Sequence, residues 1–292
     1  MNIINNIKGW GYKIGYWNYI SRMIYRQINK RIFKRTLSLR LKNGLLLRLP
    51  IWSGFAAVAW VTNGTADDGC EEVVELFANK NSEFYDVGAH FGYWALRVAH
   101  ESSRVIAFEP NPICQKDLRY NLATVNHLVV SKAVSDQEGD LEFLADSSAP
   151  HSALITPGET NQRKGSRIKV PVTTLDATWQ SNGNKLVWGI KIDTEGHEAS
   201  VVRGGLQMTK ASHPIILIEA SSKSVIEISE ILQPLDYFYG WLSQRKVNHQ
   251  QILYIAEMDT AQKTFKEGML FAFPRNKTEL LSNINLEIKK IF

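Results

Sequence analysis

Residues 83–92 have the sequence EFYDVGAHFG, and they are the clearest indication of the fold class in this chain. Its first half is a short apolar run that predicts a buried strand, and residues 93–100 after it have the pattern of a helix. Gly88 and Gly92 lie between the two in a Gly-x-x-x-Gly turn. Glycines let the backbone approach a ligand closely, and the start of a helix presents unpaired N–H groups to an anionic part of it. The stretch therefore predicts a strand, a ligand-binding turn and a helix in succession.

The same alternation of strands and helices continues along the chain. Strands are predicted at residues 104–108, 127–134, 139–144, 185–192, 214–218, 237–242 and 269–273. Helices are predicted at residues 71–80 and 111–126 and from near Glu198 onward, and residues 145–167, rich in Ser, Pro, Gly and Thr, are predicted to form a loop. Strands that alternate with helices form a mostly parallel sheet with helices on both faces. The sequence therefore predicts an α/β protein with a Rossmann-like sheet.

The first 66 residues have a different pattern, and we expect them to form an N-terminal extension to a domain at residues 67–292. Leucines alternate with polar residues on both sides of Asn43-Gly44. This is the strongest short signal for a β-hairpin, because both turn residues tolerate a positive φ. Before it, residues 16–35 are predicted to form a basic amphipathic helix.

Two rows of side chains alternate along this predicted helix. They are Ile20, Ile24, Ile28 and Ile32 in one row, and Arg22, Arg26, Lys30 and Lys34 in the other. The rows are offset by two residues, about 200° around a helix, so they lie on opposite faces. One interpretation is an interfacial helix on an anionic membrane or a polyanionic glycan. The other is a helix whose isoleucine row packs on the protein's own core, with the basic row in solvent.

The charge of the chain is unevenly distributed. The net charge is +5, but the first 66 residues hold 11 of the 34 Lys and Arg and none of the 29 Asp and Glu, which leaves a net charge of −6 on the rest. This split predicts a mildly acidic catalytic body with a basic leader, and not a nucleic-acid-binding protein. The sequence shows no membrane-spanning run and no signal peptide, and Cys70 and Cys114 fit no metal or redox spacing. We expect a cytoplasmic protein, with peripheral contact at the inner membrane or with an anionic polysaccharide if the basic helix is interfacial.

Two acidic residues stand at the ends of the first two strands predicted for the domain. Asp86 is placed where a carboxylate would repel a phosphate but attract a cationic amine, such as the methionine ammonium of S-adenosylmethionine. Glu109 comes 23 residues later and can accept hydrogen bonds from a ribose diol. The turn also lacks the third glycine of the Gly-x-Gly-x-x-Gly pyrophosphate motif. The pair favours a nucleoside cofactor over a purely structural turn.

A second acidic cluster follows the strand predicted at residues 185–192. Asp193, Glu195, His197 and Glu198 occur within six residues, and Glu219 ends the next strand. These side chains are expected at the sheet edge that carries the first two acids, and they can supply general-base or metal-ligand chemistry. A metal ion bridging Asp193 and Glu219 would lack a clear third ligand, so no metal site is predicted. The structural alternatives are a helix N-cap for Asp193 and a helix-dipole charge for Glu198.

Five segments together resemble the FkbM-type methyltransferase family, within the class I S-adenosylmethionine-dependent methyltransferases. They are residues 84–92, 105–110, 172–176, 190–198 and 215–219. Their Asp-x-Gly-Ala-x-x-Gly, Phe-Glu-Pro and Lys-Ile-Asp-x-Glu-Gly-x-Glu elements are specific in combination, and the resemblance extends over roughly residues 36–275. It implies a seven-stranded sheet with one antiparallel strand, and O-methylation of a hydroxyl of a sugar, a glycan or a secondary metabolite.

The resemblance also implies roles at the matching positions. The cofactor-binding residues are then Asp86, Gly88, Ala89 and Gly92 at the methionine end, Glu109 at the ribose and Ser135 near the adenine. Asp193 and Glu195 are expected close to the transferred methyl group. An acceptor hydroxyl needs a general base within hydrogen-bond reach, and Glu195 and His197 are the candidates. The imidazole has the more suitable ordinary pKa, near 6.5.

Two other classes of protein stay open. One is a nicotinamide-dependent oxidoreductase, which the missing third glycine disfavours. The other is a noncatalytic adaptor whose working part is the basic N-terminal region. For a methyltransferase, the expected partner is a small-molecule or glycan acceptor.

Overall fold

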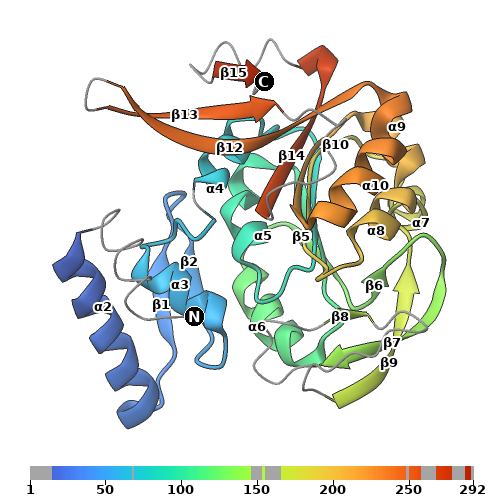
Figure 1. Cartoon of the computed structure of the whole chain (residues 1–292). Coiled ribbons are helices and arrows are strands. Elements are labelled where there is room, and N and C mark those ends of the chain that lie inside the picture. Colours follow the sequence, from blue (N-terminus) through green and yellow to red (C-terminus); the bar gives the residue numbers. More distant parts are fainter. Residues whose placement is uncertain are drawn as a thin grey trace.

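The computed structural model describes residues 15–67, 69–145, 153–154, 166–247, 250–257, 268–277 and 287–290. A central sheet runs through the molecule with helices on both of its faces, and a small second sheet lies at one end (Figure 1). The N-terminal elements pack together on one side of this body.

The central sheet confirms the predicted α/β class. Its order is β15-β13-β12-β14-β11-β10-β3-β4-β5. The strands are β3 (Glu83–Val87), β4 (Arg104–Phe108), β5 (His127–Val130), β10 (Val187–Ile192), β11 (Ile215–Ala220), β12 (Tyr237–Val247), β13 (Gln250–Glu257), β14 (Gly268–Pro274) and β15 (Glu287–Lys290). From β12 to β5 the sheet has the expected seven strands with one antiparallel member, β14, which is antiparallel to both β11 and β12.

The sheet continues beyond these seven strands. The strand predicted at residues 237–242 is only the first half of β12, which extends to Val247 and pairs antiparallel with β13. β13 then pairs in parallel with β15, so the described sheet has nine strands.

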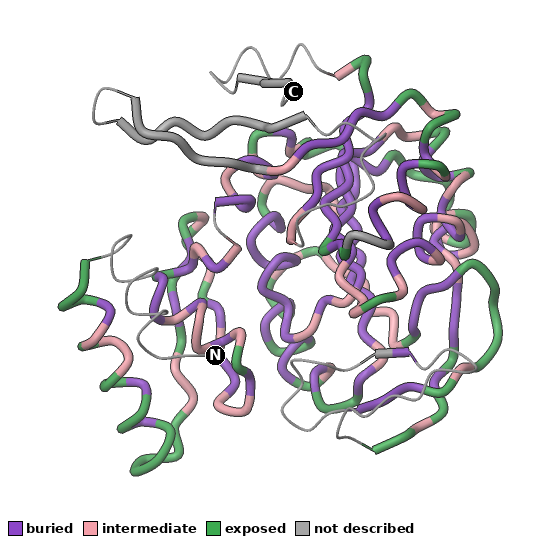
Figure 2. Tube along the Cα trace, viewed as in Figure 1, coloured by how far each residue is buried: buried purple, intermediate pink, exposed green. Residues whose placement is uncertain are grey.

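Apolar layers cover both faces of β3, β4, β10, β11 and β14, and Figure 2 shows these central strands as largely buried. In β11, Ile215 and Leu217 belong to one layer, and Ile216 and Ile218 belong to the other. The first layer includes α4 (Cys70–Leu76), α5 (Tyr93–Arg97) and α6 (Pro112–Leu122), and the second includes α7 (Leu175–Ser181), α8 (Glu198–Arg203), α9 (Leu206–Ser212) and α10 (Ser222–Leu232). Burial on both faces is why these strands are continuous apolar runs in the sequence.

The small second sheet corrects two predictions. The strand predicted at residues 127–134 is split, because β6 (Ala133–Val134) leaves the central sheet and pairs in parallel with β9 (Ser166–Thr173). β9 also pairs antiparallel with β7 (Gly139–Ala145), which pairs with β8 (Ala153–Leu154). The loop predicted at residues 145–167 is therefore wrong at Ala145 in β7, at β8 and at the start of β9, and its remaining residues, 146–152 and 155–165, lie outside the described part.

The N-terminal elements are α2 (Tyr16–Ile28), a π-helical continuation (Asn29–Phe33), β1 (Leu37–Arg40), β2 (Leu46–Leu49) and α3 (Gly54–Val61). The predicted Asn-Gly hairpin is confirmed by the antiparallel pairing of β1 with β2. Leu39 and Leu47 are buried in the same apolar layer as α4, α5 and α6. The Asn43 side chain donates to the carbonyl oxygens of Leu96 (2.9 Å) and Arg97 (2.8 Å) at the end of α5. The hairpin therefore shares an apolar core with the domain, and its Asn43 side chain caps the C-terminal end of α5.

The orientation of α2 differs from the predicted one. Arg22 and Arg26 face α3, whereas Ile24, Ile28 and Ile32 are exposed. Of the other members of the two rows, Ile20 is half-buried, and Lys30 and Lys34 are exposed. The interpretation that the isoleucine row packs on the core is therefore wrong, and so is the placing of these two arginines at an outer surface. None of the helices in the described ranges has both the length and the apolar character needed to cross a bilayer.

Candidate active site

A cavity of about 490 Å³ opens at the carboxyl ends of β3, β4, β10 and β11. Ligands bind at this edge in open α/β sheets, and the volume is typical of a small-molecule site. Apolar side chains in its wall include Phe55, Val58, Phe108, Val134, Phe143 and Leu154. The polar ones include Asp67, His90, Glu109, Lys132, Lys191, Asp193, Thr194, Glu195 and Glu219.

The cavity brings together five of the nine predicted site residues. Gly88, Ala89, Glu109, Asp193 and Glu195 line it. Asp86, Gly92, Ser135 and His197 do not belong to the lining. Local packing explains this division.

Gly88 and Gly92 are required by neighbouring parts of the chain. Gly88 has a φ of +76°, and a Cβ atom there would lie 1.9 Å from the carbonyl oxygen of Asp193. The close approach predicted for the turn is thus an approach to the backbone after β10. Gly92 has a φ of +89°, and its Cβ would lie 2.9 Å from Cδ1 of Leu118 in α6. Both glycines permit packing that shapes the turn, and Gly88 also lines the cavity.

Asp86 is buried beside the turn and binds the protein's own backbone. Its Oδ2 accepts a hydrogen bond from the Ala95 N–H of α5 (2.9 Å), and its Oδ1 has no partner among the described residues. Burial raises the pKa of Asp86 to about 6, against the opposing effect of Lys191 and the Ala95 N–H. Asp86 therefore fixes the start of α5, and it is not among the residues that line the cavity.

Glu109 occupies the position expected of it at the end of β4. Its Oε2 accepts from the His90 N–H (2.7 Å) and its Oε1 from the Asn111 N–H (2.8 Å). Burial raises the pKa of Glu109 to about 7, although both N–H groups act in the opposite direction. Asn111 is also the N-cap of α6, with its side chain accepting from the Ile113 N–H (3.0 Å). Two backbone segments thus hold the carboxyl group in the cavity wall.

Lys191 is a buried cation to which the sequence pattern assigned no role. Its Nζ donates to Oδ2 of Asp193 (3.0 Å) and to the carbonyl oxygen of Gly88 (3.3 Å). Burial alone would lower the pKa of Lys191, but the carboxylates of Asp193, Asp86 and Asp67 raise it above its ordinary value. Lys191 therefore stays charged, and its ammonium group links Gly88 after β3 to Asp193 after β10.

Asp193 and Glu219 share a hydrogen bond between their carboxyl groups at the rim. The negative charge of Asp193 and, second, burial raise the pKa of Glu219 to about 8. Burial would raise the pKa of Asp193, but its contacts with Lys191 and Glu219 hold it below its usual range. At neutral pH Glu219 is therefore protonated and donates to an ionised Asp193. No described group of three or more His, Cys, Asp and Glu side chains is arranged to hold a metal ion.

Glu195 and His197, the two candidate bases, occupy different environments. Glu195 lines the cavity in a left-handed backbone conformation, with a φ of 57°. His197 is not among the lining residues, and its Nε2 lies 2.8 Å from Oγ of Ser135. Ser135 also donates to Oδ1 of Asp136 (3.1 Å). The structure thus joins His197 to the residue predicted to lie near the adenine.

The side chain of Glu198 stabilises the loop between β10 and α8. Its Oε1 accepts from the N–H groups of Thr194 (3.3 Å) and Gly196 (2.8 Å). Glu198 also lies in the first turn of α8, as the structural alternative for this residue expects. His197 is the N-cap residue of α8, so the N-cap alternative for Asp193 is wrong.

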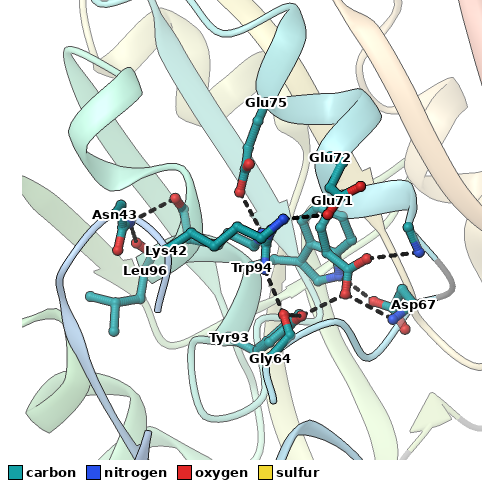
Figure 3. Close-up of polar contacts among 12 residues, drawn as sticks. Lys42, Asn43, Gly64, Asp67, Glu71, Glu72, Glu75, Tyr93, Trp94 and Leu96 are labelled. Carbon is teal, nitrogen blue, oxygen red and sulfur yellow. Dashed lines mark hydrogen bonds and ion pairs between the residues drawn. The ribbon is translucent and has the colours of Figure 1, made fainter. Parts of the chain in front are cut away.

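Asp67 is a cavity residue that the sequence pattern did not indicate. Its Oδ2 accepts from Nε1 of Trp94 (2.7 Å), and its backbone N–H donates to Oε1 of Glu71 (2.8 Å). Glu71 also accepts from the hydroxyl of Tyr93 (2.5 Å), whose oxygen lies 2.8 Å from the carbonyl oxygen of Gly64. Figure 3 shows this network between α4, α5 and the segment before α4. Burial and the charge of Glu71 raise the pKa of Asp67 to about 7.

His90 completes the turn after β3. It has a φ of 55°, and its ring lies edge-on to that of Trp52, 5.2 Å between centroids. Burial and the charge of Lys191 lower the pKa of His90 to about 4, so its imidazole is neutral at pH 7. Its Nε2 is buried without a partner among the described residues. Such an atom in a cavity wall fits hydrogen bonding to a bound ligand.

Comparison with solved structures gives matches of low sequence identity. The methyltransferase FkbM from Methylobacillus flagellatus KT is 15% identical over 74% of this chain and 52% of that chain, with a TM-score of 0.42. A putative methyltransferase from Streptococcus mutans, in complex with S-adenosylhomocysteine, is 9% identical over 70% of this chain and 96% of that chain, with a TM-score of 0.41. The matched region spans about half the length of the Methylobacillus chain. A search of curated proteins finds no match.

The family assignment rests on a different comparison. The model of the methyltransferase FkbM domain matches residues 86–239, which is more than half of the chain. The match begins at Asp86, includes Glu109, Asp193 and Glu195, and ends in β12. The chain therefore belongs to the methyltransferase FkbM domain family, a family of S-adenosylmethionine-dependent methyltransferases.

Proposed function

We propose that the protein transfers the methyl group of S-adenosylmethionine to a hydroxyl of a sugar, a glycan or a secondary metabolite. The observation that carries this proposal is that one cavity holds both Glu109, placed for a nucleoside, and Glu195, a candidate base. Family membership favours this cofactor over the nicotinamide alternative and favours an enzyme over an adaptor.

The cavity residues fit the cofactor. Each carboxylate oxygen of Glu109 accepts one backbone N–H and has a second lone pair for a ribose hydroxyl. The apolar side chains of Phe108 and Phe143 fit the adenine, and the unpartnered Nε2 of His90 is a further polar contact.

Asp67 replaces Asp86 as the proposed partner of the methionine ammonium. Asp67 lines the cavity, and only one of its carboxyl oxygens is bonded to Trp94. Because its pKa is raised to about 7, a cation bound beside it would favour the ionised form and release a proton near neutral pH. Asp86 lacks this access, since it is bonded to α5 outside the lining.

The bound cofactor supplies an already activated methyl group, so the chain has to position the acceptor oxygen and take up its proton. We assign the proton to the carboxylate of Glu195, which receives it as the new C–O bond forms. Asp193 is less suited to this role, because Lys191 and Glu219 hold its pKa low. It can instead accept a hydrogen bond from a neighbouring hydroxyl and orient the acceptor. His197 is not among the residues that line the cavity, and its Nε2 lies 2.8 Å from Oγ of Ser135, so we assign it no part in the proton transfer.

The acidic rim supports a hydroxyl-bearing acceptor. Asp193, Glu195 and Glu219 line the cavity, where a carboxylate can accept hydrogen bonds and a protonated carboxyl group can donate one. Thr194 adds a hydroxyl. A polyhydroxylated molecule can donate to several carboxylate oxygens at once. An apolar acceptor molecule would leave these polar side chains without hydrogen-bond partners, which is unfavourable.

Two measurements test the proposal. Thermal-shift titrations with S-adenosylmethionine, S-adenosylhomocysteine and NAD should raise the melting temperature with the first two only, because only a ligand of the folded state stabilises it. Transfer of labelled methyl is then measured to a panel of sugars and phenolic metabolites, with amines and thiols as the contrasting class. Transfer to amines or thiols with none to hydroxyls would contradict the assigned acceptor, and stabilisation by NAD alone would restore the oxidoreductase alternative.

A further inference from the structure

The polar face of α2 holds this helix to the body of the protein. Nε of Arg22 donates to the carbonyl oxygen of Trp60 (2.7 Å), and the guanidinium carbon lies 4.3 Å from the centre of the Trp60 ring. Arg26 donates to the carbonyl oxygen of Ser53 (3.0 Å), and Nε1 of Trp60 donates back to the carbonyl oxygen of Arg22 (3.0 Å). Two arginines therefore hold the helix to the two ends of α3.

The opposite face of α2 and its π-helical continuation is apolar and exposed. Trp17 is 83% exposed, Ile24 50%, Ile28 40% and Ile32 69%. Trp17, Ile24 and Ile28 are seven and four residues apart, a spacing that places them on one helical face. We call these four residues the isoleucine face. In Figure 1 the helix lies at the margin of the molecule.

Positive charge accompanies the isoleucine face. Lys30 and Arg31 lie in the π-helical continuation, Lys34 and Arg35 directly follow it, and all four side chains are exposed. The first 66 residues contain no Asp or Glu to neutralise them. Two copies of the chain joined through this face would bring like charges together, which is unfavourable. An anionic bilayer satisfies both properties, since it takes up apolar side chains and attracts Lys and Arg.

We propose that the isoleucine face docks the enzyme on an anionic lipid bilayer, with the following Lys and Arg residues at the level of the headgroups. The helix lies in the plane of the surface, and Arg22 and Arg26 keep it attached to the protein. The inference is independent of which acceptor the enzyme methylates.

The test uses the full chain and vesicle flotation. Vesicles of phosphatidylcholine are compared with vesicles that also contain phosphatidylglycerol, at increasing salt concentration. The chain is expected to float with the anionic vesicles only, and the bound fraction should fall as salt rises, because screening acts within about 8–10 Å. Absence of binding to the anionic vesicles at low salt overturns the proposal.

Two sets of variants locate the docking surface. Ile24→Ser, Ile28→Ser and Ile32→Ser combined should weaken binding by at least about tenfold, because three apolar side chains no longer enter the bilayer. The matched control combines Leu46→Ser, Ile113→Ser and Leu186→Ser, which are exposed elsewhere, and it should bind as the wild type does. Lys30→Gln with Arg31→Gln should weaken binding by about fivefold per charge, whereas Lys116→Gln with Lys210→Gln should not.

The thermal shift given by S-adenosylhomocysteine should be the same for all four variant proteins and the wild type, which shows that the fold is intact. Wild-type binding by the isoleucine variant would overturn the proposal. So would a dimer of the wild type in light scattering that the isoleucine variant abolishes, because a second copy would then be the occupant of this face.

Discussion

The strand ends and helix α2 depart in opposite ways from the usual distribution of side chains. At the strand ends, Asp86, Glu109 and Lys191 are charged or titratable groups that are buried. On α2, Trp17 and Ile32 are large apolar side chains that are exposed. Proteins commonly bury large apolar side chains and expose charged ones.

The two regions differ in whether contacts within the protein offset the cost of this unusual placement. Each buried acid at the strand ends accepts hydrogen bonds from the chain itself, as Glu109 does from the N–H groups of His90 and Asn111. The exposed side chains of α2 have no comparable cover in the described residues. A substitution at the strand ends should therefore change the isolated protein, while one on the outer face of α2 should change only its association with a surface.

The largest effect is expected at the proposed base. Glu195→Gln should lower kcat by about 10²–10⁴-fold, because the acceptor proton loses its receiver. Cofactor affinity, measured by titration calorimetry, should stay the same. His197→Ala is the comparison, since its ring contacts Ser135 and not the cavity, and it should retain far more turnover. Equal losses in the two variants would return His197 to the list of candidate bases.

The glycine turn after β3 sharpens the contrast in stability. Gly88 and Gly183 have similar positive φ values, +76° and +81°, but only Gly88 has a neighbour at the Cβ position, the carbonyl oxygen of Asp193 at 1.9 Å. Gly183→Ala should cost about 1 kcal/mol from the left-handed conformation alone. Gly88→Ala should cost about 3–5 kcal/mol, because the backbone must also move. Chemical denaturation measures both, and equal costs would refute the packing explanation.

At Glu109, a smaller effect is expected on binding. Glu109→Gln should weaken S-adenosylmethionine by about 1.5–3 kcal/mol, the range for hydrogen bonds to a charged group. Glu109→Ala would also leave the N–H groups of His90 and Asn111 without an acceptor, so the amide variant is the cleaner one. Calorimetry gives the affinity, and thermal unfolding without ligand reports any damage to the fold. Undiminished affinity would remove Glu109 from the pocket.

Protonation of Asp67 gives a further, weaker effect that depends on pH. Its pKa is raised to about 7, so the folded chain binds more protons than the unfolded chain between about pH 4 and 7. The free energy of unfolding should then fall as pH rises through this window, by at most about 1.4 kcal/mol per pH unit from this group. Asp67→Asn should make the fall shallower, and the exposed Asp140→Asn is its control. Parallel curves for Asp67→Asn and the wild type would contradict the raised pKa.

The smallest effect belongs to the isoleucine face. Ile28→Ser should change the free energy of unfolding in water by less than about 0.5 kcal/mol, as exposed substitutions usually do. Ile216→Ala, in the buried part of β11, should cost about 2–5 kcal/mol. If Ile28→Ser were as costly as Ile216→Ala, another part of this chain would be covering α2.

The strand ends could be predicted from sequence because their geometry follows from a regular pattern. Parallel strands end at one edge, so Glu109, Asp193 and Glu195 were expected to meet, and they do. His197 was not predictable in the same way. It lies only two residues beyond Glu195, but the hydrogen bonds that Glu198 accepts turn the loop and direct the ring to Ser135. No periodicity describes such a loop.

Asp67 and the exposed face of α2 depended on contacts between distant segments. Asp67 reaches the cavity because Glu71, Tyr93 and Trp94 fix the segment before α4. Periodicity identified two opposite faces on α2, but it could not show which one is buried. The carbonyl oxygens at the ends of α3 decide this, since they accept from Arg22 and Arg26. Helix α3 also contributes Phe55 and Val58 to the cavity wall.

Helix α3 is therefore in contact with α2 on one side and with the reaction cavity on another. If α2 rests on a bilayer, this short, rigid connection fixes the direction in which the cavity opens relative to the lipid. An acceptor carried on a lipid would then diffuse to the enzyme in two dimensions, within a layer of constant height. Such an enzyme would discriminate among acceptors partly by how far each one's hydroxyl stands from the membrane.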